Sequence, residues 1–156
     1  MYAQTEKLNK KRKSTMYKLL QNQAVSKFHN EINDLGWEEA AATYPALDAY
    51  LKARTGADLT SSQTKAFSIT FLPHYTHVAD IDANTLEDAF HIHNNPMGDE
   101  DLEAQITRYT TQHSMSVGDL LVDESGRIYI CDTFGFTYVG EDEFEAGIER
   151  GMKEAV

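Results

Sequence analysis

Six histidines and one cysteine are the residues of this chain that most readily bind metal ions or attack substrates. Four of the histidines fall in two close pairs, His74 with His77 and His91 with His93. An odd spacing in an extended segment sends two side chains to opposite faces, and residues two apart on a helix diverge by about 200°. No Cys-x-x-Cys or His-Glu-x-x-His pattern supports either pair. We therefore expect no metal site and no cofactor.

Cys131 is followed by Asp132 and preceded in the sequence by His113, which are partners that a thiol nucleophile could use. A nucleophilic cysteine needs an electropositive, partly exposed setting, because the thiolate is the reactive form. The run Arg-Ile-Tyr-Ile-Cys instead predicts a strand in which Cys131 shares a face with Tyr129. Glycine motifs of the GxGxxG and GxxxxGK[ST] types do not occur. We expect a buried cysteine, no catalytic residue and no enzymatic activity.

Charge is divided unevenly between a basic N-terminal arm, residues 1–13, and an acidic remainder. The first 18 residues hold six bases and one acid, whereas the rest of the chain holds eight bases and 24 acids. An acidic body repels phosphate backbones and attracts basic protein surfaces. We therefore expect a partner protein with a basic or nucleic-acid-binding surface, and nucleic-acid contact only through the arm. The candidate binding residues are Lys10, Lys11, Arg12, Lys13, Glu100, Asp101, Glu103, Glu141, Asp142 and Glu143.

The first half of the chain, residues 14–56, carries apolar residues at every third or fourth position, which is the spacing of a helix. Gly36 separates two such stretches, and Pro45 breaks the second one. We expect two antiparallel helices joined by a short turn, forming a helical hairpin that packs on the face of a small sheet.

The second half, residues 65–156, supplies the sheet, so we expect a single α+β domain over residues 1–156 with mostly antiparallel strands. Alternating apolar residues over 66–82 predict a hairpin with its turn at Pro73 and His74.

A short helix is expected between the hairpins. Asn84 and Glu87 have the spacing of an N-terminal capping pair, and Phe90 falls on the apolar stripe of the helix that they would start. A closing amphipathic helix is expected after residue 140, with acids in its first turn and bases in its last.

The most patterned stretch of the chain is residues 113–139. It predicts a strand, a turn at Asp123–Gly126, a second strand, a bend at Gly135 and a third strand. Serines at the strand entrance can bond backbone groups, an aspartate can anchor the turn, and a phenylalanine can plug the sheet. These roles predict a structural motif rather than an active site. Its residues are Ser114, Ser116, Gly118, Asp119, Gly135 and Phe136.

The same motif carries a resemblance. SMSVGD at 114–119, GRIY at 126–129 and GF at 135–136 resemble the C-terminal motif of small YodL-like proteins, which are encoded by bacteriophages and mobile elements. The likeness spans residues 84–139 and is specific in its final part. It implies an accessory protein that acts by binding host machinery.

We therefore expect a phage-encoded, non-enzymatic accessory protein that binds and modulates a host macromolecular machine, such as a polymerase, nuclease or defence complex, through an acidic surface. Two alternatives stay open: a virion or assembly component that self-associates, and a metal-dependent enzyme with a site in the region 74–93. No apolar run approaches the roughly 20 residues that span a bilayer. A lone cysteine fits a reducing compartment, so we expect the cytoplasm of the host bacterium and no membrane contact.

Overall fold

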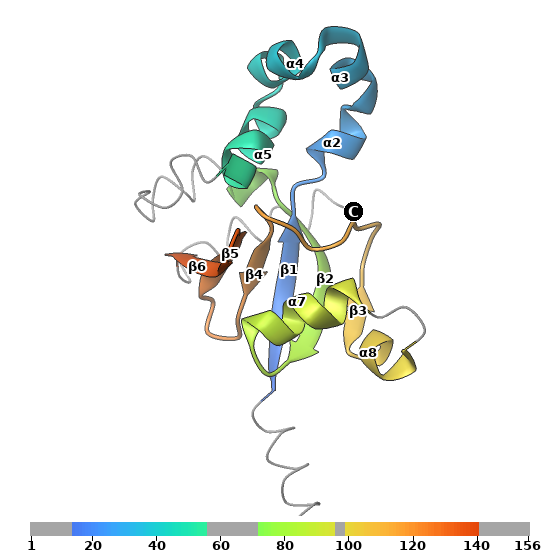
Figure 1. Ribbon diagram of the computed structural model, residues 1–156, viewed down its shortest axis with the longest axis vertical. Coiled ribbons are helices and arrows are strands. Elements are labelled where there is room, and N and C mark those ends of the chain that lie inside the picture. The colour runs from blue at the N-terminus through green and yellow to red at the C-terminus, as the bar shows by residue number, and fades with distance from the viewer. Residues whose placement is uncertain (1–13, 56–71, 96–98, 141–156) are drawn as a thin grey trace, which may run out of the picture.

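The centre of the protein is a six-stranded antiparallel sheet with the strand order β3-β2-β1-β4-β5-β6. The computed structural model describes residues 14–55, 72–95 and 99–140. The strands are β1 (Thr15–Gln21), β2 (Thr76–Ala83), β3 (Ile106–Arg108), β4 (Leu120–Val122), β5 (Ile128–Asp132) and β6 (Gly135–Gly140) (Figure 1). A sheet accompanied by helices confirms the predicted α+β class.

The middle strand, β1, occupies residues that the apolar spacing assigns to a helix, so the helix expected from Ser14 is wrong. β1 pairs with β2 along its length and with β4 at Lys18–Leu20. Leu19 and Leu20 are both buried, one on each face of the sheet. A strand that is buried on both faces has apolar neighbours, here Leu19 and Leu20, and periodicity alone cannot distinguish such a stretch from a helix. The part expected to be helical, 14–56, therefore supplies the middle of the sheet.

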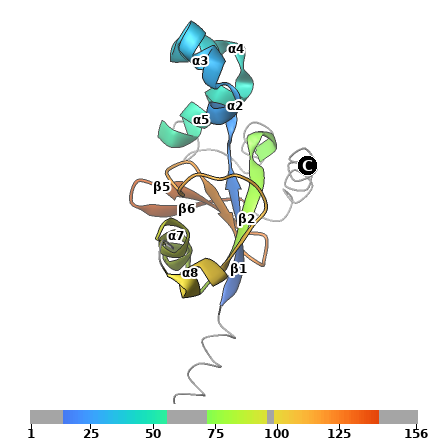
Figure 2. The ribbon, with the colours of Figure 1, turned by 90° about the vertical axis from the view of Figure 1, so that its right-hand side faces the viewer.

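Four short helices follow β1 and lie beyond the end of the sheet rather than across its face (Figures 1 and 2). They are α2 (Ala24–Lys27), α3 (His29–Leu35), α4 (Trp37–Thr43) and α5 (Pro45–Thr55). The helix break at Gly36 (φ 81°) and the one at Pro45 are confirmed. The expected pair of antiparallel helices on the sheet face is wrong, because this stretch forms four helices that bury a small core of their own. That core consists of Ala24, Ile32, Ala40 and Leu47.

The helices meet the sheet through α5. Its Ala49 and Ala53 pack into the cluster formed on one face of the sheet by residues such as Leu20, Leu120 and Ile130. Small side chains on α5 let the helix approach the strands closely. The helical part is therefore fixed to the sheet by the second half of α5.

β2 lies between two strands from other parts of the chain, since it pairs with β1 and, at Ala79–Ile81, with β3. The hairpin expected over 66–82 is therefore wrong. Alternation shows that a strand is half buried, but it does not show which strand lies beside it. The expected turn at Pro73 and His74 is the 3-10 helix η1 (Leu72–His74), and residues 66–71 lie outside the described ranges.

The other face of the sheet is covered by α7 (Leu86–Asn94), and α8 (Glu100–Ala104) follows it beside β3 (Figure 1). Ala89 and Ile92 of α7 are buried in the cluster that contains Leu19 of β1. Covering both faces at the middle of the sheet explains why adjacent residues such as Leu19 and Leu20 of β1 are both buried. In the described residues, no helix is long and apolar enough to cross a membrane.

Thr85 is the N-cap of α7, so the cap expected at Asn84 is wrong by one residue. The Thr85 hydroxyl oxygen accepts a hydrogen bond from the Asp88 N–H at 3.1 Å, and Thr85 has the extended backbone of an N-cap. Thr85→Ala should therefore lower the free energy of unfolding by about 1 kcal/mol in urea denaturation. Thr85→Ser keeps the acceptor and should change it little. Equal stabilities of the two variants would contradict this cap.

The two hairpins at the C-terminal end of the described chain confirm the sequence pattern. In the turn between β4 and β5, the Gly126 N–H donates to the Asp123 carbonyl at 3.0 Å, and Gly126 has a φ of 85°. Ile128 and Ile130 of β5 are buried together on one face. β6 then pairs with β5 from Gly135 onward. The closing helix expected after residue 140 lies outside the described residues.

Candidate functional site

The patterned stretch begins in a segment, residues 109–119, that we call the crossover segment. β3 and β4 lie on opposite sides of the β1–β2 pair, so the chain between them must pass these two strands (Figure 1). The first residues of the crossover segment are held by the Val78 carbonyl, which accepts hydrogen bonds from the Tyr109 N–H (2.9 Å) and the Gln112 side-chain amide (3.1 Å). Met115, which is 2% exposed, anchors its middle in the core. The crossover segment is thus fixed before it enters β4.

Asp119 and Gln21 form a buried polar pair where the crossover segment meets β4. Gln21 Nε2 donates to Asp119 Oδ2 at 3.0 Å and to the His113 carbonyl at 2.9 Å. The Ser116 N–H donates to the same carboxylate oxygen at 2.9 Å. Because Gln21 is the last residue of β1, these bonds tie the crossover segment to the middle of the sheet.

The Asp119 carboxyl group is held in a setting that disfavours its charge. Burial raises the pKa of Asp119 to about 6, although His113, the Ser116 N–H and the Gln21 amide act in the opposite direction. A raised pKa in a buried acid can mark a catalytic group. Here the hydrogen bonds to Asp119 come from the protein's own backbone and from Gln21, so the group anchors a turn.

Gly118 allows α5 to approach the crossover segment. It has a φ of 97°, and a Cβ at this position would meet Ala53 at 3.3 Å. The Tyr75 hydroxyl also donates to the Gly118 carbonyl. A side chain here would be strained by the backbone conformation and by the contact with Ala53. Gly118 therefore has a packing role.

The six motif residues do not converge on one point. Ser114 is exposed, and Ser116 bonds through its backbone N–H rather than through its hydroxyl. Gly135 and Phe136 lie instead on the β5–β6 hairpin, where Phe136 is paired with Cys131. The motif therefore builds the strand entrance at one end and presents a hairpin at the other.

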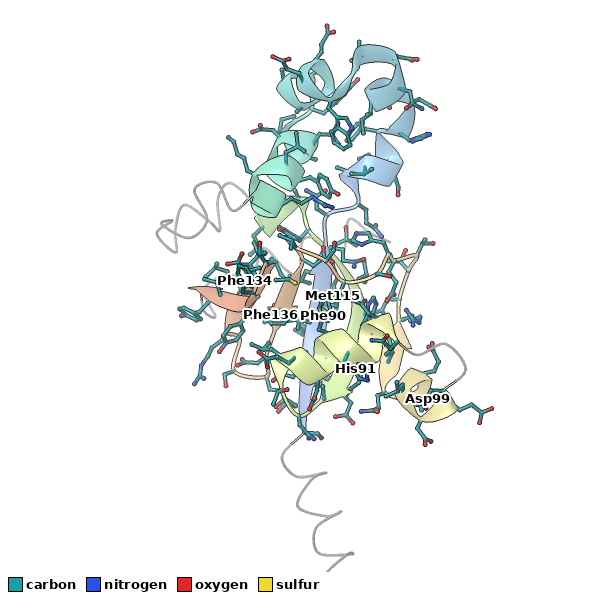
Figure 3. The ribbon with its side chains drawn as sticks, viewed as in Figure 1. Phe90, His91, Asp99, Met115, Phe134 and Phe136 are labelled. Atoms are coloured by element: carbon teal, nitrogen blue, oxygen red, sulfur yellow. The ribbon has the colours of Figure 1, made fainter. Side chains whose placement is uncertain are left out.

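A groove of about 240 Å³ lies between that hairpin and α7, and we call it the aromatic groove. Figure 3 shows Phe90 of α7 on the side of the molecule where Phe134 and Phe136 lie. The lining is mostly apolar, with two carboxylates among it. The groove is lined by Glu87, Phe90, Cys131, Asp132, Thr133, Gly135 and Phe136.

Aromatic side chains next to the groove are open to solvent. Phe134, at the tip of the β5–β6 turn, is 100% exposed, and Phe90 in the groove is 37% exposed. Tyr138, two residues after Phe136 on β6, is 47% exposed. Single exposed apolar residues are common on protein surfaces, but gathered ones are typical of surfaces that bind other molecules. We call Phe90, Phe134 and Tyr138, together with the groove, the aromatic face.

This face could not be predicted from the sequence pattern, which places Phe90 on the inner stripe of a helix and Phe136 inside the sheet. The available signal was Phe134, which occupies a tight turn where Gly, Asn, Asp and Ser are usual. An apolar residue there gains nothing from folding. Such a position is more readily explained by contact with another molecule.

The acids predicted to bind a partner lie partly on α8, away from the aromatic face. Glu100, Asp101 and Glu103 are exposed, but Glu103 forms an ion pair with Arg108 at 2.9 Å. Asp99 of the same segment, seen in Figure 3 far from Phe134, caps α8. The remaining predicted binding residues lie outside the described part of the chain. They are Lys10, Lys11, Arg12, Lys13, Glu141, Asp142 and Glu143.

The buried histidines are engaged within the protein. His77 Nε2 lies 2.7 Å from one Asp80 oxygen, and the Tyr109 hydroxyl donates to the other. The buried His93 ring is hydrogen-bonded to Gln112. Across residues 14–55, 72–95 and 99–140, no group of three or more His, Cys, Asp or Glu side chains could hold a metal ion.

Cys131 is only 4% exposed, which confirms the expectation of a buried cysteine. Burial raises the pKa of its thiol to about 11, and Asp119 and Asp132 add to the effect. The thiolate that a nucleophile requires is therefore scarce at neutral pH.

Alkylation tests this setting of Cys131. With iodoacetamide at pH 7.5, the native protein should react at least about 100-fold more slowly than a free cysteine, because a pKa near 11 leaves little thiolate. Intact-mass spectrometry after mixing would show the unmodified chain, and the chain in guanidinium chloride should gain one adduct. Reaction of the native protein at the rate of a free thiol would contradict this setting.

This arrangement is suited to holding apolar groups of another molecule, since its exposed side chains are aromatic and its only thiol is buried. Two carboxylates at the groove add a negative field to the same face. Comparisons of the chain with protein-family models, curated proteins and solved structures find no match.

Proposed function

We propose that this chain is a non-enzymatic accessory protein, encoded by a bacteriophage or mobile element, that binds a protein component of a host macromolecular machine in the bacterial cytoplasm. The observation that carries this proposal is the aromatic face, in which the fully exposed Phe134 lies between the groove residues Thr133 and Gly135. The resemblance of residues 113–139 to phage and mobile-element proteins supports the biological setting.

Exposed aromatic residues favour binding for an energetic reason. Burying apolar surface contributes roughly 25 cal/mol per Å², and aromatic side chains each bury 150–250 Å² when they are covered. Phe134 gains none of this stabilisation when the protein is alone, because it is 100% exposed. Aromatic residues are also enriched in interfaces and in their hot spots. A partner that covers this face would therefore gain affinity from few contacts.

The charge of the chain supports a basic partner. Its formal net charge is −11 at pH 7. Charge of this size steers association with basic protein surfaces and disfavours phosphate backbones. Components of polymerases, nucleases and defence complexes carry basic surfaces for their nucleic acids, which makes them suitable targets.

Affinity capture from the lysate of a candidate bacterial host tests the proposal. The tagged wild-type protein and its Phe134→Ser variant are compared, with Leu35→Ser as a control, because Leu35 is an exposed apolar residue on α3. We expect one nucleic-acid-handling protein to be held by the wild type and the control, to be lost with Phe134→Ser, and to bind again when purified. Recovery of only this chain or of capsid proteins would contradict the proposal and favour a structural component.

A further inference from the structure

The size of the aromatic groove limits what can occupy it. At about 240 Å³ it is smaller than the 300–1,000 Å³ of sites that bury a cofactor or another drug-sized ligand. One aliphatic side chain with its backbone fits such a volume. The occupant is therefore part of a larger molecule that is held mainly elsewhere on the aromatic face.

The lining of the groove defines the chemistry of that side chain. Phe90 and Phe136 form its walls, and the buried Cys131 lies among them. Groups of this kind make dispersion contacts with an aliphatic chain and offer little hydrogen bonding. Leucine, isoleucine and methionine match this lining better than a polar side chain does.

The charges beside the groove define what flanks the side chain. Glu87 on α7 and Asp132 at the end of β5 both line it. Asp132 accepts hydrogen bonds from the Thr133 N–H and the Thr137 hydroxyl, so its carboxylate is held in place by the hairpin. Two carboxylates around an apolar groove favour lysine or arginine next to the inserted side chain.

A second copy of this chain is a poor occupant. Each copy carries a net charge of −11, so two copies repel each other, and the groove itself is acidic. A basic partner is attracted both by the overall field and by the local carboxylates.

We infer that the aromatic groove receives one aliphatic side chain from a basic segment of the partner protein, with lysine or arginine on either side of it facing Glu87 and Asp132. The inference rests on the proposed function, because it names the partner chemistry for the same face. Phe134 lies beside the groove and covers the remainder of that segment.

Three synthetic peptides test it by NMR titration of the full, ¹⁵N-labelled chain. The probe is acetyl-Gly-Lys-Leu-Lys-Gly-amide, and its controls carry Ser for Leu or Glu for both Lys. We expect the probe to shift the amide signals of Thr133, Gly135 and Phe136 with a Kd of about 1 mM or below, as suits so small a ligand. Neither control peptide should bind. Binding of the serine peptide as tightly as the probe would overturn the inference.

Matched variants locate the binding. Glu87→Lys and Phe90→Ser should each weaken binding of the probe peptide at least about fivefold. Glu100→Lys, the same charge change on α8, should leave the affinity for the probe unchanged. Equal weakening by Glu87→Lys and Glu100→Lys would overturn a local role for the groove. A second result would also overturn the inference. If deleting residues 1–13 shifts the amide signals of the groove residues in the absence of peptide, the basic arm is the occupant.

The two proposals fail in different ways. If Phe134→Ser abolishes capture of the cellular partner but no probe peptide binds, the partner is confirmed and the groove chemistry is wrong. If the probe binds the groove but no partner is captured from any host lysate, the groove chemistry holds and the proposed function is wrong.

Discussion

Asp119→Asn should stabilise the protein at pH 7.5, whereas Asp119→Ala should be less stable than the asparagine variant by about 3 kcal/mol. Asparagine presents an oxygen to the Ser116 N–H and the Gln21 amide, and it carries no charge to be buried. Alanine leaves both buried donors without this acceptor, at about 1–3 kcal/mol for each. Chemical denaturation of the three proteins at one pH measures the ranking.

The pH dependence of the same comparison follows from the raised pKa. The folded protein holds the Asp119 proton with a pKa of about 6, above the value near 3.9 of an unfolded chain. The folded state therefore binds this proton more tightly, and the resulting stability is complete below pH 3.9 and is lost as pH rises through 6. Between pH 4.5 and 7.5 the wild type should lose about 2 kcal/mol relative to Asp119→Asn. A constant difference across this range would contradict the charged burial of Asp119.

Replacing Phe90 and Phe134 together by serine should weaken binding to the captured partner by about 100-fold or more. Hot-spot aromatic residues contribute about 2–4 kcal/mol each when they are truncated in an interface, and each 1.4 kcal/mol is tenfold in Kd. Calorimetric titration of the purified partner measures the change. The Phe134 replacement should leave the free energy of unfolding nearly constant, because Phe134 is fully exposed, whereas loss of Phe90, which is 37% exposed, should lower it, so folding of the variant is verified before the titration.

Leu35→Ser provides the control for this double variant, since it removes an exposed apolar side chain from α3. It should leave the affinity for the partner unchanged. An affinity that falls equally in the control and the double variant would indicate general loss of apolar surface. Unchanged affinity in the double variant would contradict a binding role for the aromatic face.

The sequence predicts best the elements whose signals are local. The β4–β5 turn depends on Asp123 and Gly126, and its geometry follows from residues that lie within it. The helix breaks at Gly36 and Pro45 and the burial of Cys131 are local in the same sense. These features need no knowledge of what lies beside them, so they could be predicted.

The elements that depend on distant partners could not be predicted. β1 carries buried apolar residues on both faces, Leu20 toward α5 and Leu19 toward α7, and its run of residues fits a helix equally well. The alternation of apolar residues in β2 likewise does not predict that β2 pairs with β3. The aromatic groove could not be predicted for the same reason, since Phe90 and Phe136 are far apart in sequence and line one groove only in the folded protein.

Hydrogen exchange measured by mass spectrometry on the protein alone and in complex with its captured partner tests the binding face most directly. Binding through the aromatic face should slow exchange of backbone amides in residues 86–92 and 131–138. Residues 100–104 of α8 and the helices between 24 and 55 should exchange at unchanged rates. Protection confined to α8 or to those helices, with 131–138 unaffected, would contradict the account.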